Sequence, residues 1–439
     1  MKKFKSCIHI QNSIYLSPHE IRACCQRFFV DDKIKGDVAL LTLDKPQDID
    51  FSEVISAKEK LVKNINNGVD DRCDGCGLLE EREWSEISDE KINVISIENH
   101  SLCNMKCTYC SDTYYGGIEP QYPLDFLFTT MNSVGDNLHI AWGGGEPTIR
   151  KDFNDIFSYA NSKFMPKTQR VFTNALKYSK RLQKALDDRE TSITTSIDAG
   201  TEETFIKIRD SKGLERVLRF LERYAENSPD LVTVKYIFTL ENYDVENISQ
   251  FVEKVKKNNL TKCNFLISAD FKFSELNNDI VMAIISMYFR LYFDGIHTVS
   301  FDDHVFHKVR AIGRDILSYL SVVSFDEKED KILIKIMDFI KNKERNNIVV
   351  WGTGEFSKFL FKTMDPSKAN NQVNIVAVID GIENKWGNDF MGHEIKSPEF
   401  LATNNYDIVI ASVNFYGEIF NNIVNKGISK ERIIPNFML

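Results

Sequence analysis

Apolar residues between about 91 and 270 recur in short runs that are separated by segments of helical periodicity. These runs are rich in β-branched and aromatic residues, which favour strands. The intervening segments, for example 214–224 and 245–257, predict helices. Strands that alternate with helices form a parallel sheet with right-handed crossovers. The pattern therefore predicts an α/β domain over 91–270, with strands at 93–97, 139–142, 170–173, 192–197, 232–239 and 262–267.

Three further regions flank this domain. Residues 1–90 look irregular and hold five cysteines, which predicts a small domain that a metal would stabilise. Residues 271–345 read as a helical connector, with helices at 280–293, 305–320 and 331–343. From 346 to 439 the strand–helix rhythm restarts, with strands at 347–351, 373–379, 407–411 and a possible last one at 432–434.

Charge and hydropathy narrow the classes of function. The net charge is −9, so no global excess of Lys and Arg exists to neutralise phosphates, and we expect neither nucleic acid nor membrane as a partner. No apolar run reaches membrane-spanning length, and the N-terminus does not resemble a signal peptide. We therefore expect a cytoplasmic protein with reduced thiols, in which clustered cysteines are metal ligands before they are disulfides.

The strongest chemical signal is the spacing Cys103-x3-Cys107-x2-Cys110, on the loop that follows the first predicted strand of the central domain. Ligands on one short loop can converge on a single cluster. Three thiolates would occupy three irons of a [4Fe–4S] cubane and leave the fourth iron open. A zinc site is the alternative, but the only nearby fourth ligand is His100.

These features resemble the radical SAM superfamily, whose enzymes cleave S-adenosylmethionine (SAM) at such a cluster. An aromatic residue precedes the third cysteine, and three segments follow successive strands in the family's order: Ala141–Pro147 (AWGGGEP), Phe172–Ala175 (FTNA, where the family has Thr-Asn-Gly) and Thr195–Gly200 (TSIDAG). The resemblance covers 91–270 and implies a partial (β/α)6 barrel. It also implies SAM contacts from Tyr109, Gly144, Gly145, Glu146, Asn174, Ser196, Asp198 and Arg209.

The cysteines of the N-terminal region form a second group, with Cys73-x2-Cys76 as a local metal signature. The stretch from Cys7 to Cys25 resembles the auxiliary-cluster SPASM and twitch domains, here placed before the core. That comparison makes Cys24 the ligand and Cys25 a bystander. It implies a second [4Fe–4S] cluster on Cys7, Cys24, Cys73 and Cys76; a structural Zn²⁺ on the same four is the alternative. Cys263 lies in a predicted strand and reads as a buried apolar residue.

The C-terminal region resembles small Rossmann-like domains attached to glycan-modifying and sugar-nucleotide enzymes. Gly352-Thr-Gly354 follows a strand and opens a helix, Ser357 replaces the third glycine of the dinucleotide fingerprint, and Asp380 ends the next strand. Binding of a nucleotide or sugar nucleotide is one interpretation. A domain that kept the fold and lost the ligand is the other.

The resemblance implies reductive cleavage of SAM to a 5′-deoxyadenosyl radical, which abstracts hydrogen from a small or carrier-bound substrate such as a sugar or nucleotide-linked metabolite. A flavodoxin- or ferredoxin-type reductant is then expected as a partner. Two alternatives are a peptide-modifying (RiPP-type) radical SAM maturase and a non-catalytic iron–sulfur electron carrier or sensor. No catalytic residue that touches the substrate can be named from the sequence.

Overall fold

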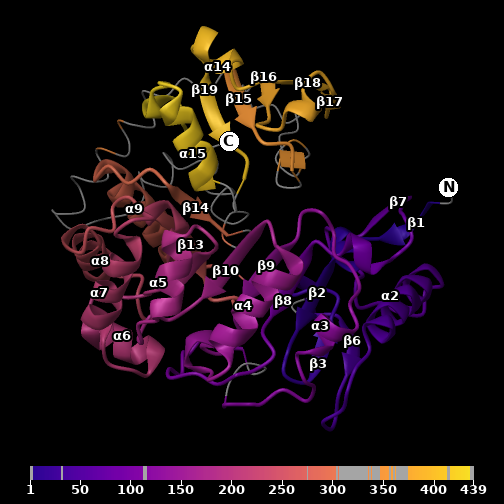
Figure 1. The fold of residues 1–439 in the computed structure, drawn as a ribbon. Coiled ribbons are helices and arrows are strands. Elements are labelled where there is room, and N and C mark those ends of the chain that lie inside the picture. Colours follow the sequence, from indigo (N-terminus) through magenta and orange to yellow (C-terminus); the bar gives the residue numbers. More distant parts are fainter. Residues whose placement is uncertain are drawn as a thin grey trace. The chain divides into compact units, whose positions relative to one another are not determined.

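A computed structural model describes residues 3–30, 33–111, 116–273, 275–302, 347–354, 374–412 and 416–435, with single positions 305, 335, 338, 357, 358 and 361. Contacts along the chain divide it into two units (Figure 1). The first consists of 1–196 and 205–232, and the second of 197–204 and 233–439. The fold class is mixed α/β with parallel sheets.

The first unit contains eleven described strands: β1 (Lys3–Ser6), β2 (Ser13–Leu16), β3 (Glu20–Arg22), β4 (Arg27–Val30), β5 (Lys33–Gly36), β6 (Ala39–Thr42), β7 (Glu80–Glu83), β8 (Val94–Ile97), β9 (His139–Trp142), β10 (Thr168–Phe172) and β11 (Ser192–Ser196). Its described helices are α1 (Ile8–Asn12), α2 (Phe51–Asn66), α3 (Phe126–Thr129), α4 (Phe153–Phe164), α5 (Lys180–Asp187), α6 (Glu202–Arg209, which begins in the second unit) and α7 (Leu214–Ala225).

Seven strands of the first unit are neighbours in one sheet, in the order β11-β10-β9-β8-β2-β3-β6, while β1 pairs with β7 and β4 with β5. From β11 to β2 all neighbours are parallel, whereas β3 and β6 join antiparallel. The N-terminal region thus extends the sheet beside β8, with Ile14 opposite Ile95. Because β8 is paired on both sides, the three-cysteine loop emerges from a buried strand.

The second unit contains β12 (Val232–Phe238), α8 (Val245–Lys257), β13 (Asn264–Ala269), α9 (Asn278–Phe293) and β14 (Val299–Phe301). Its three strands are parallel and lie in the order β12-β13-β14. Apolar positions alternate along β12, so that Tyr236 and Phe238 pack together and Tyr236 meets Phe251 of α8.

A separate five-stranded sheet is formed by the C-terminal residues, in the order β17-β18-β16-β15-β19. Its elements are β15 (Asn347–Trp351), β16 (Asn374–Ile379), β17 (Asp389–Phe390), β18 (His393–Lys396), α14 (Phe400–Thr403), β19 (Asp407–Ile410) and α15 (Tyr416–Asn425). All neighbours except β17 and β18 are parallel. Trp351 of β15, Ile379 of β16 and Ile410 of β19 belong to one buried apolar cluster.

The structure agrees with the sequence where the pattern was regular. Each of the six strands predicted for 91–270 is present, and α7 and α8 begin and end within one residue of the predicted bounds. The irregular reading of residues 1–90 was wrong, because α2 is a 16-residue helix with a capping box formed by Asp50 and Glu53. Of the helical connector, α9 is described, but the helices predicted at 305–320 and 331–343 lie outside the described residues apart from isolated positions. Strand 432–434 is reduced to one bridge, Ile408 to Ile433.

Among the described helices, none is long and apolar enough to cross a membrane.

Candidate SAM and cluster sites

The three-cysteine loop is fixed by its backbone rather than by regular structure. Lys106 and Thr108 donate their N–H groups to the carbonyls of Arg209 and Ile208, at 3.1 and 2.9 Å. The loop is thereby tied to the C-terminal end of α6, while Met105 is buried beneath it. None of its three cysteines is in a disulfide. The chain therefore presents Cys103, Cys107 and Cys110 from a loop with a defined path.

The glycine segment after β9 lies directly against this loop. Gly145 donates its N–H to the His100 carbonyl at 2.8 Å, and Glu146 donates to that of Leu102 at 2.7 Å. A Cβ on Gly145 would overlap the Leu102 carbonyl oxygen, and Gly144 has a φ of 85° that other residues rarely adopt. These glycines therefore let the glycine segment and the three-cysteine loop approach each other closely. The sequence did not reveal this role, because the resemblance assigned both glycines to contact with SAM.

Glu146 joins the loops that follow β9 and β10. Its side chain is 2% exposed. Oε1 accepts hydrogen bonds from the hydroxyls of Thr148 (2.5 Å) and Thr173 (2.9 Å) and from the Thr148 N–H (3.2 Å), and Oε2 accepts from the Asn174 N–H at 2.6 Å. Burial raises the pKa of Glu146, and these donors oppose that effect. The carboxylate thus positions both loops, whereas the resemblance implied a contact with SAM.

Asn174 reaches from β10 to the cysteine loop. Its Nδ2 donates to Asn104 Oδ1 at 2.6 Å and lies 3.7 Å from the sulfur of Cys103. The next residue, Ala175, stands where the family has glycine, and it has a φ of 53°. The backbone therefore keeps the left-handed turn that a glycine would favour, although the sequence departs from the motif.

Arg209 and Tyr109 meet beside the loop. The Arg209 guanidinium lies 5.6 Å from the centroid of the Tyr109 ring, and its Nη2 donates to the Ser196 carbonyl at 2.8 Å. Arg209 is 4% exposed. This contact anchors the end of β11 to α6, and it brings together three of the residues that the resemblance implied.

Asp198 belongs to the second unit, where it fixes β12. Its Oδ1 accepts the Ile237 N–H at 2.7 Å, and its own carbonyl accepts from Asn242 Nδ2 at 2.9 Å. The side chain is fully buried. These contacts give it a positioning role within this unit.

Replacing Asp198 by asparagine is expected to flatten the pH dependence of stability. Burial raises the pKa of Asp198 to about 8, although Lys235 opposes the shift. The unfolded chain ionises at this position near pH 4 and the folded chain does not. The contribution of this residue to the free energy of unfolding is therefore fully present below about pH 4. It falls by up to about 1.4 kcal/mol per pH unit as the pH rises toward 8.

Asparagine keeps the acceptor for Ile237 and tolerates the φ of 60° at this position. Apparent melting temperatures between pH 5 and 8 should therefore fall more steeply for the native protein than for Asp198→Asn. Parallel slopes would contradict the assignment.

Four N-terminal cysteines line one pocket. Its walls come from α1, from the chain between the end of β3 and the start of β6, and from the segment after α2. Burial, with a smaller contribution from neighbouring thiolates, raises the pKa of Cys7 to about 11 and that of Cys73 to about 12. Thiolates there need a compensating positive charge, as a bound metal supplies. The cysteines of this pocket are Cys7, Cys24, Cys73 and Cys76.

Cys25 lies outside this group. It is an exposed residue, it does not line the pocket, and it hydrogen-bonds with the Tyr15 side chain. Cys263 is fully buried, as expected for an apolar role. Among the described residues, no group of three or more His, Cys, Asp or Glu side chains is arranged to hold a single metal ion. The ligands of a cubane bind four different irons and stand farther apart.

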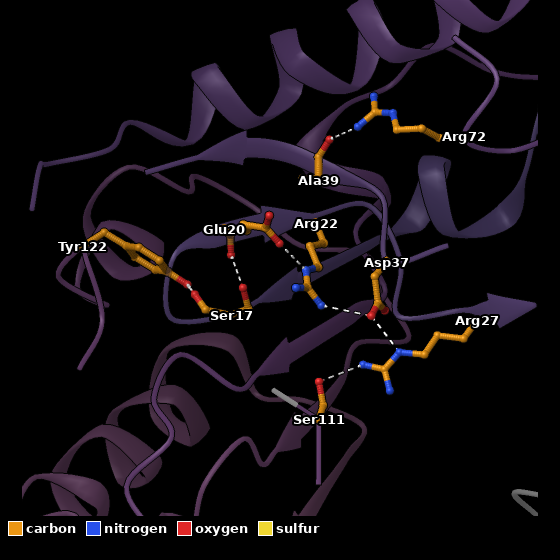
Figure 2. Close-up of polar contacts among 9 residues, drawn as sticks. All are labelled: Ser17, Glu20, Arg22, Arg27, Asp37, Ala39, Arg72, Ser111 and Tyr122. Carbon is orange, nitrogen blue, oxygen red and sulfur yellow. Dashed lines mark hydrogen bonds and ion pairs between the residues drawn. The ribbon is translucent and has the colours of Figure 1, made fainter. Parts of the chain in front are cut away.

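Figure 2 shows a polar network that joins the two cysteine regions. Arg22 pairs with Glu20 at 2.7 Å and with Asp37 at 3.3 Å. Arg27 pairs with the same Asp37 oxygen at 2.7 Å and donates to the Ser111 hydroxyl at 3.5 Å. Arg22 and Arg27 flank Cys24 in the sequence, and Ser111 follows Cys110. The network therefore fixes the segment of Cys24 against the end of the three-cysteine loop.

The C-terminal loop uses its polar side chains internally. Ser357 Oγ donates to the Gly352 carbonyl at 2.7 Å and lies 3.3 Å from that of Ala411. The Asp380 carboxylate accepts hydrogen bonds from the Thr353 hydroxyl, from Lys385 Nζ at 3.0 Å and from the Ile382 N–H at 2.9 Å. The acid predicted for a ribose is thus held by the domain itself.

Residues 100–263 match the family model described as Radical SAM superfamily. The chain carries a radical SAM domain. This domain includes the three-cysteine loop, the glycine segment and Glu146, and it implies a [4Fe–4S] cluster and SAM as cofactors. The donor set fits: three thiols stand on one loop. Residues 344–434 match a second model, described as C2185-like, N-terminal.

The radical SAM domain also matches curated proteins. A GTP 3′,8-cyclase of Shewanella denitrificans is 28% identical over 159 residues, which are 35% of this chain and 47% of that protein. The mitochondrial GTP 3′,8-cyclase of Arabidopsis thaliana is 27% identical over 157 residues, 34% and 40% of the two chains. The chain thus spans less than half the length of these relatives. The domain and these names indicate an enzyme.

Among solved structures, SuiB of Streptococcus suis aligns with a TM-score of 0.37 and 13% identity, over 63% of this chain and 59% of that one.

Several residues that shape the radical SAM site were missed in the sequence. Thr148 and Thr173 donate to Glu146, and Asn104 accepts from Asn174. The signal for Thr148 was available, because Glu146 is the N-cap of the 3₁₀ helix Pro147–Ile149 and an N-cap side chain accepts the N–H two residues on. No local pattern marks Asn104, whose partner lies 70 residues away.

Proposed function

We propose that this chain is a radical SAM enzyme that binds a [4Fe–4S] cluster through Cys103, Cys107 and Cys110, with SAM held beside Glu146. We also propose that residues 91–270 form the partial (β/α)6 barrel that the family resemblance implies. The observation that carries it is the set of hydrogen bonds around Glu146, which joins the loops after β8, β9 and β10. Loops at the carboxyl ends of parallel strands are where such sheets bind ligands.

The cluster and SAM, when bound, supply a one-electron cleavage that yields a 5′-deoxyadenosyl radical. The protein's part is to position and enclose them. Gly144 and Gly145 bring the glycine segment against the cysteine loop, Asn174 borders Cys103, and Tyr109 with Arg209 closes the side of the loop. Ser196 would add a further SAM contact, and the contact expected from Asp198 stays a prediction. A flavodoxin- or ferredoxin-type protein would donate the electron.

For the substrate we propose a small nucleotide-linked metabolite. The relatives named GTP 3′,8-cyclase, matched over the radical SAM domain, support this class. The C-terminal sheet supports it as well, since its parallel strands follow the 3-2-1-4 order of a Rossmann-like domain when numbered from β15.

Product analysis tests the function directly. Anaerobically reconstituted, dithionite-reduced protein should release 5′-deoxyadenosine from SAM, measured by mass spectrometry, and a nucleotide should accelerate the release more than a peptide does. No product from a sample with a full iron complement would refute SAM cleavage. Acceleration by a peptide alone would favour the maturase alternative.

We further propose an auxiliary [4Fe–4S] cluster on Cys7, Cys24, Cys73 and Cys76. Two clusters correspond to about eight irons per chain. Cys24→Ala is expected to lower the iron content to about four. Cys25→Ala, the matched control, should leave it unchanged because Cys25 lies outside the pocket. About four irons in the unaltered protein, or an equal loss from both variants, would contradict this ligand set.

A further inference from the structure

A lysine occupies the apolar face of α2. The buried positions of this helix are Phe51, Val54, Lys58, Leu61 and Ile65. Their spacing is that of a core-facing stripe, and Lys58 is its middle member, with no exposed surface. Burying an ammonium group is costly unless its charge and donors are satisfied. A lysine at this position therefore needs neighbouring groups that accept its hydrogen bonds and balance its charge.

The Lys58 ammonium bonds to backbone next to the four-cysteine pocket. Its Nζ donates to the carbonyls of Ile10 at 2.9 Å and Ser13 at 2.6 Å, which end helix α1. Cys7 caps the start of the same short helix, where its sulfur accepts the Ile10 N–H at 3.4 Å. Ile10 and Cys7 both line the pocket. The charge therefore lies one helical turn from a thiol ligand.

No carboxylate of a described residue forms an ion pair with Lys58. Arg22, which is also buried, pairs with Glu20 and Asp37, and Arg72, next to Cys73, pairs with Asp70. By contrast, burial lowers the pKa of Lys58 to about 7, and a thiolate at Cys7 opposes that effect and favours the charged ammonium. Among the described residues, the group that favours a charged Lys58 is thus a thiolate of the pocket, and no carboxylate forms an ion pair with it.

We propose that Lys58 is the internal counter-charge of the four-cysteine site, where it stabilises the thiolate of Cys7 and raises the reduction potential of the cluster bound there. The physical reason is that a nearby cation favours the more negative, reduced state, and that low-dielectric surroundings strengthen the attraction. This inference rests on the proposed auxiliary cluster. Lys58 is a positioning and tuning residue and touches no substrate.

The test uses the full chain with Cys103, Cys107 and Cys110 replaced by alanine, so that only the N-terminal site binds a cluster. In this background Lys58→Gln keeps a donor for the carbonyls and removes the charge. A redox titration followed by electron paramagnetic resonance should show about tenfold less reduced cluster at a fixed potential, which is a midpoint lower by about 59 mV for one electron. Lys60→Gln, an exposed position of the same helix, should leave the midpoint unchanged.

An unchanged midpoint in Lys58→Gln would overturn the proposal. Should that variant fold poorly, Lys58→Arg provides the second measurement, because it keeps the charge and must keep the midpoint; a lowered midpoint in it would also overturn the proposal. If the background protein binds no iron, the auxiliary-cluster proposal fails by itself. Lys58 is then judged by zinc affinity, which Lys58→Gln should lower about tenfold relative to Lys60→Gln, and equal affinities would refute it.

Discussion

Replacing Cys107 by alanine is expected to reduce formation of 5′-deoxyadenosine to the background of the assay. The proposed cluster has three protein ligands and keeps its fourth iron for SAM. Cys107 is the middle one, in a loop whose path is set by backbone bonds to Ile208 and Arg209. Alanine leaves those bonds in place, so that the loss reflects the missing thiolate and not a displaced loop.

The measurement combines product analysis with iron content and the SAM-dependent change in the electron paramagnetic resonance signal. Cys25→Ala is the matched control, since it also removes one thiol of the first unit but lies outside both proposed ligand sets. Its product yield should equal that of the unaltered protein. Undiminished product from Cys107→Ala would refute the assignment of this loop to SAM cleavage.

Glu146→Gln is expected to have the second largest effect. A glutamine of the same shape must place its NH₂ group either against the Asn174 N–H or against the donors of Thr148 and Thr173, because the carboxylate accepts on both oxygens. At a site with 2% exposure, a donor facing a donor costs about 1–3 kcal/mol. The loops after β9 and β10 would then lose their shared anchor.

We expect a lower melting temperature and SAM binding weakened roughly five- to hundredfold, the equivalent of that free energy. Equilibrium binding of SAM to the reconstituted protein and thermal unfolding measure the two effects. Glu226→Gln, an exposed substitution on the same unit, should change neither. If Glu146→Gln retained both stability and affinity, the carboxylate would not be the anchor that its hydrogen bonds suggest.

How far the sequence predicted the site depended on the range of the interactions. The spacing of Cys103, Cys107 and Cys110 was sufficient to expect one cluster, because these ligands share a loop. The purpose of Gly145 was harder to foresee: its closest neighbour, Leu102, is 43 positions away and touches it only through pairing of β8 with β9. Ala175 shows the opposite case, where a departure from the motif left the backbone turn intact.

The N-terminal region marks the largest gap between sequence and structure. Its strands look short and irregular in isolation, yet β2 pairs with β8, and the apolar face of α2 carries a lysine that bonds to the end of α1. A charged residue in an otherwise regular stripe was the available signal. The partner of this lysine is the end of α1, which is distant in the sequence, so the sequence alone could not show what the lysine contacts.

The sequence by itself determined the alternation of strands and helices and the spacing of the three-cysteine loop, because periodicity and ligand spacing are local properties of the chain. The candidate SAM contacts came from the family resemblance and stay a prediction. The tertiary structure showed that Cys24, which the resemblance had favoured over Cys25, shares a pocket with Cys7, Cys73 and Cys76. It also decided what surrounds Glu146 and Lys58. Those facts depend on strand register and on the direction of side chains from segments far apart in the sequence, which no local pattern encodes.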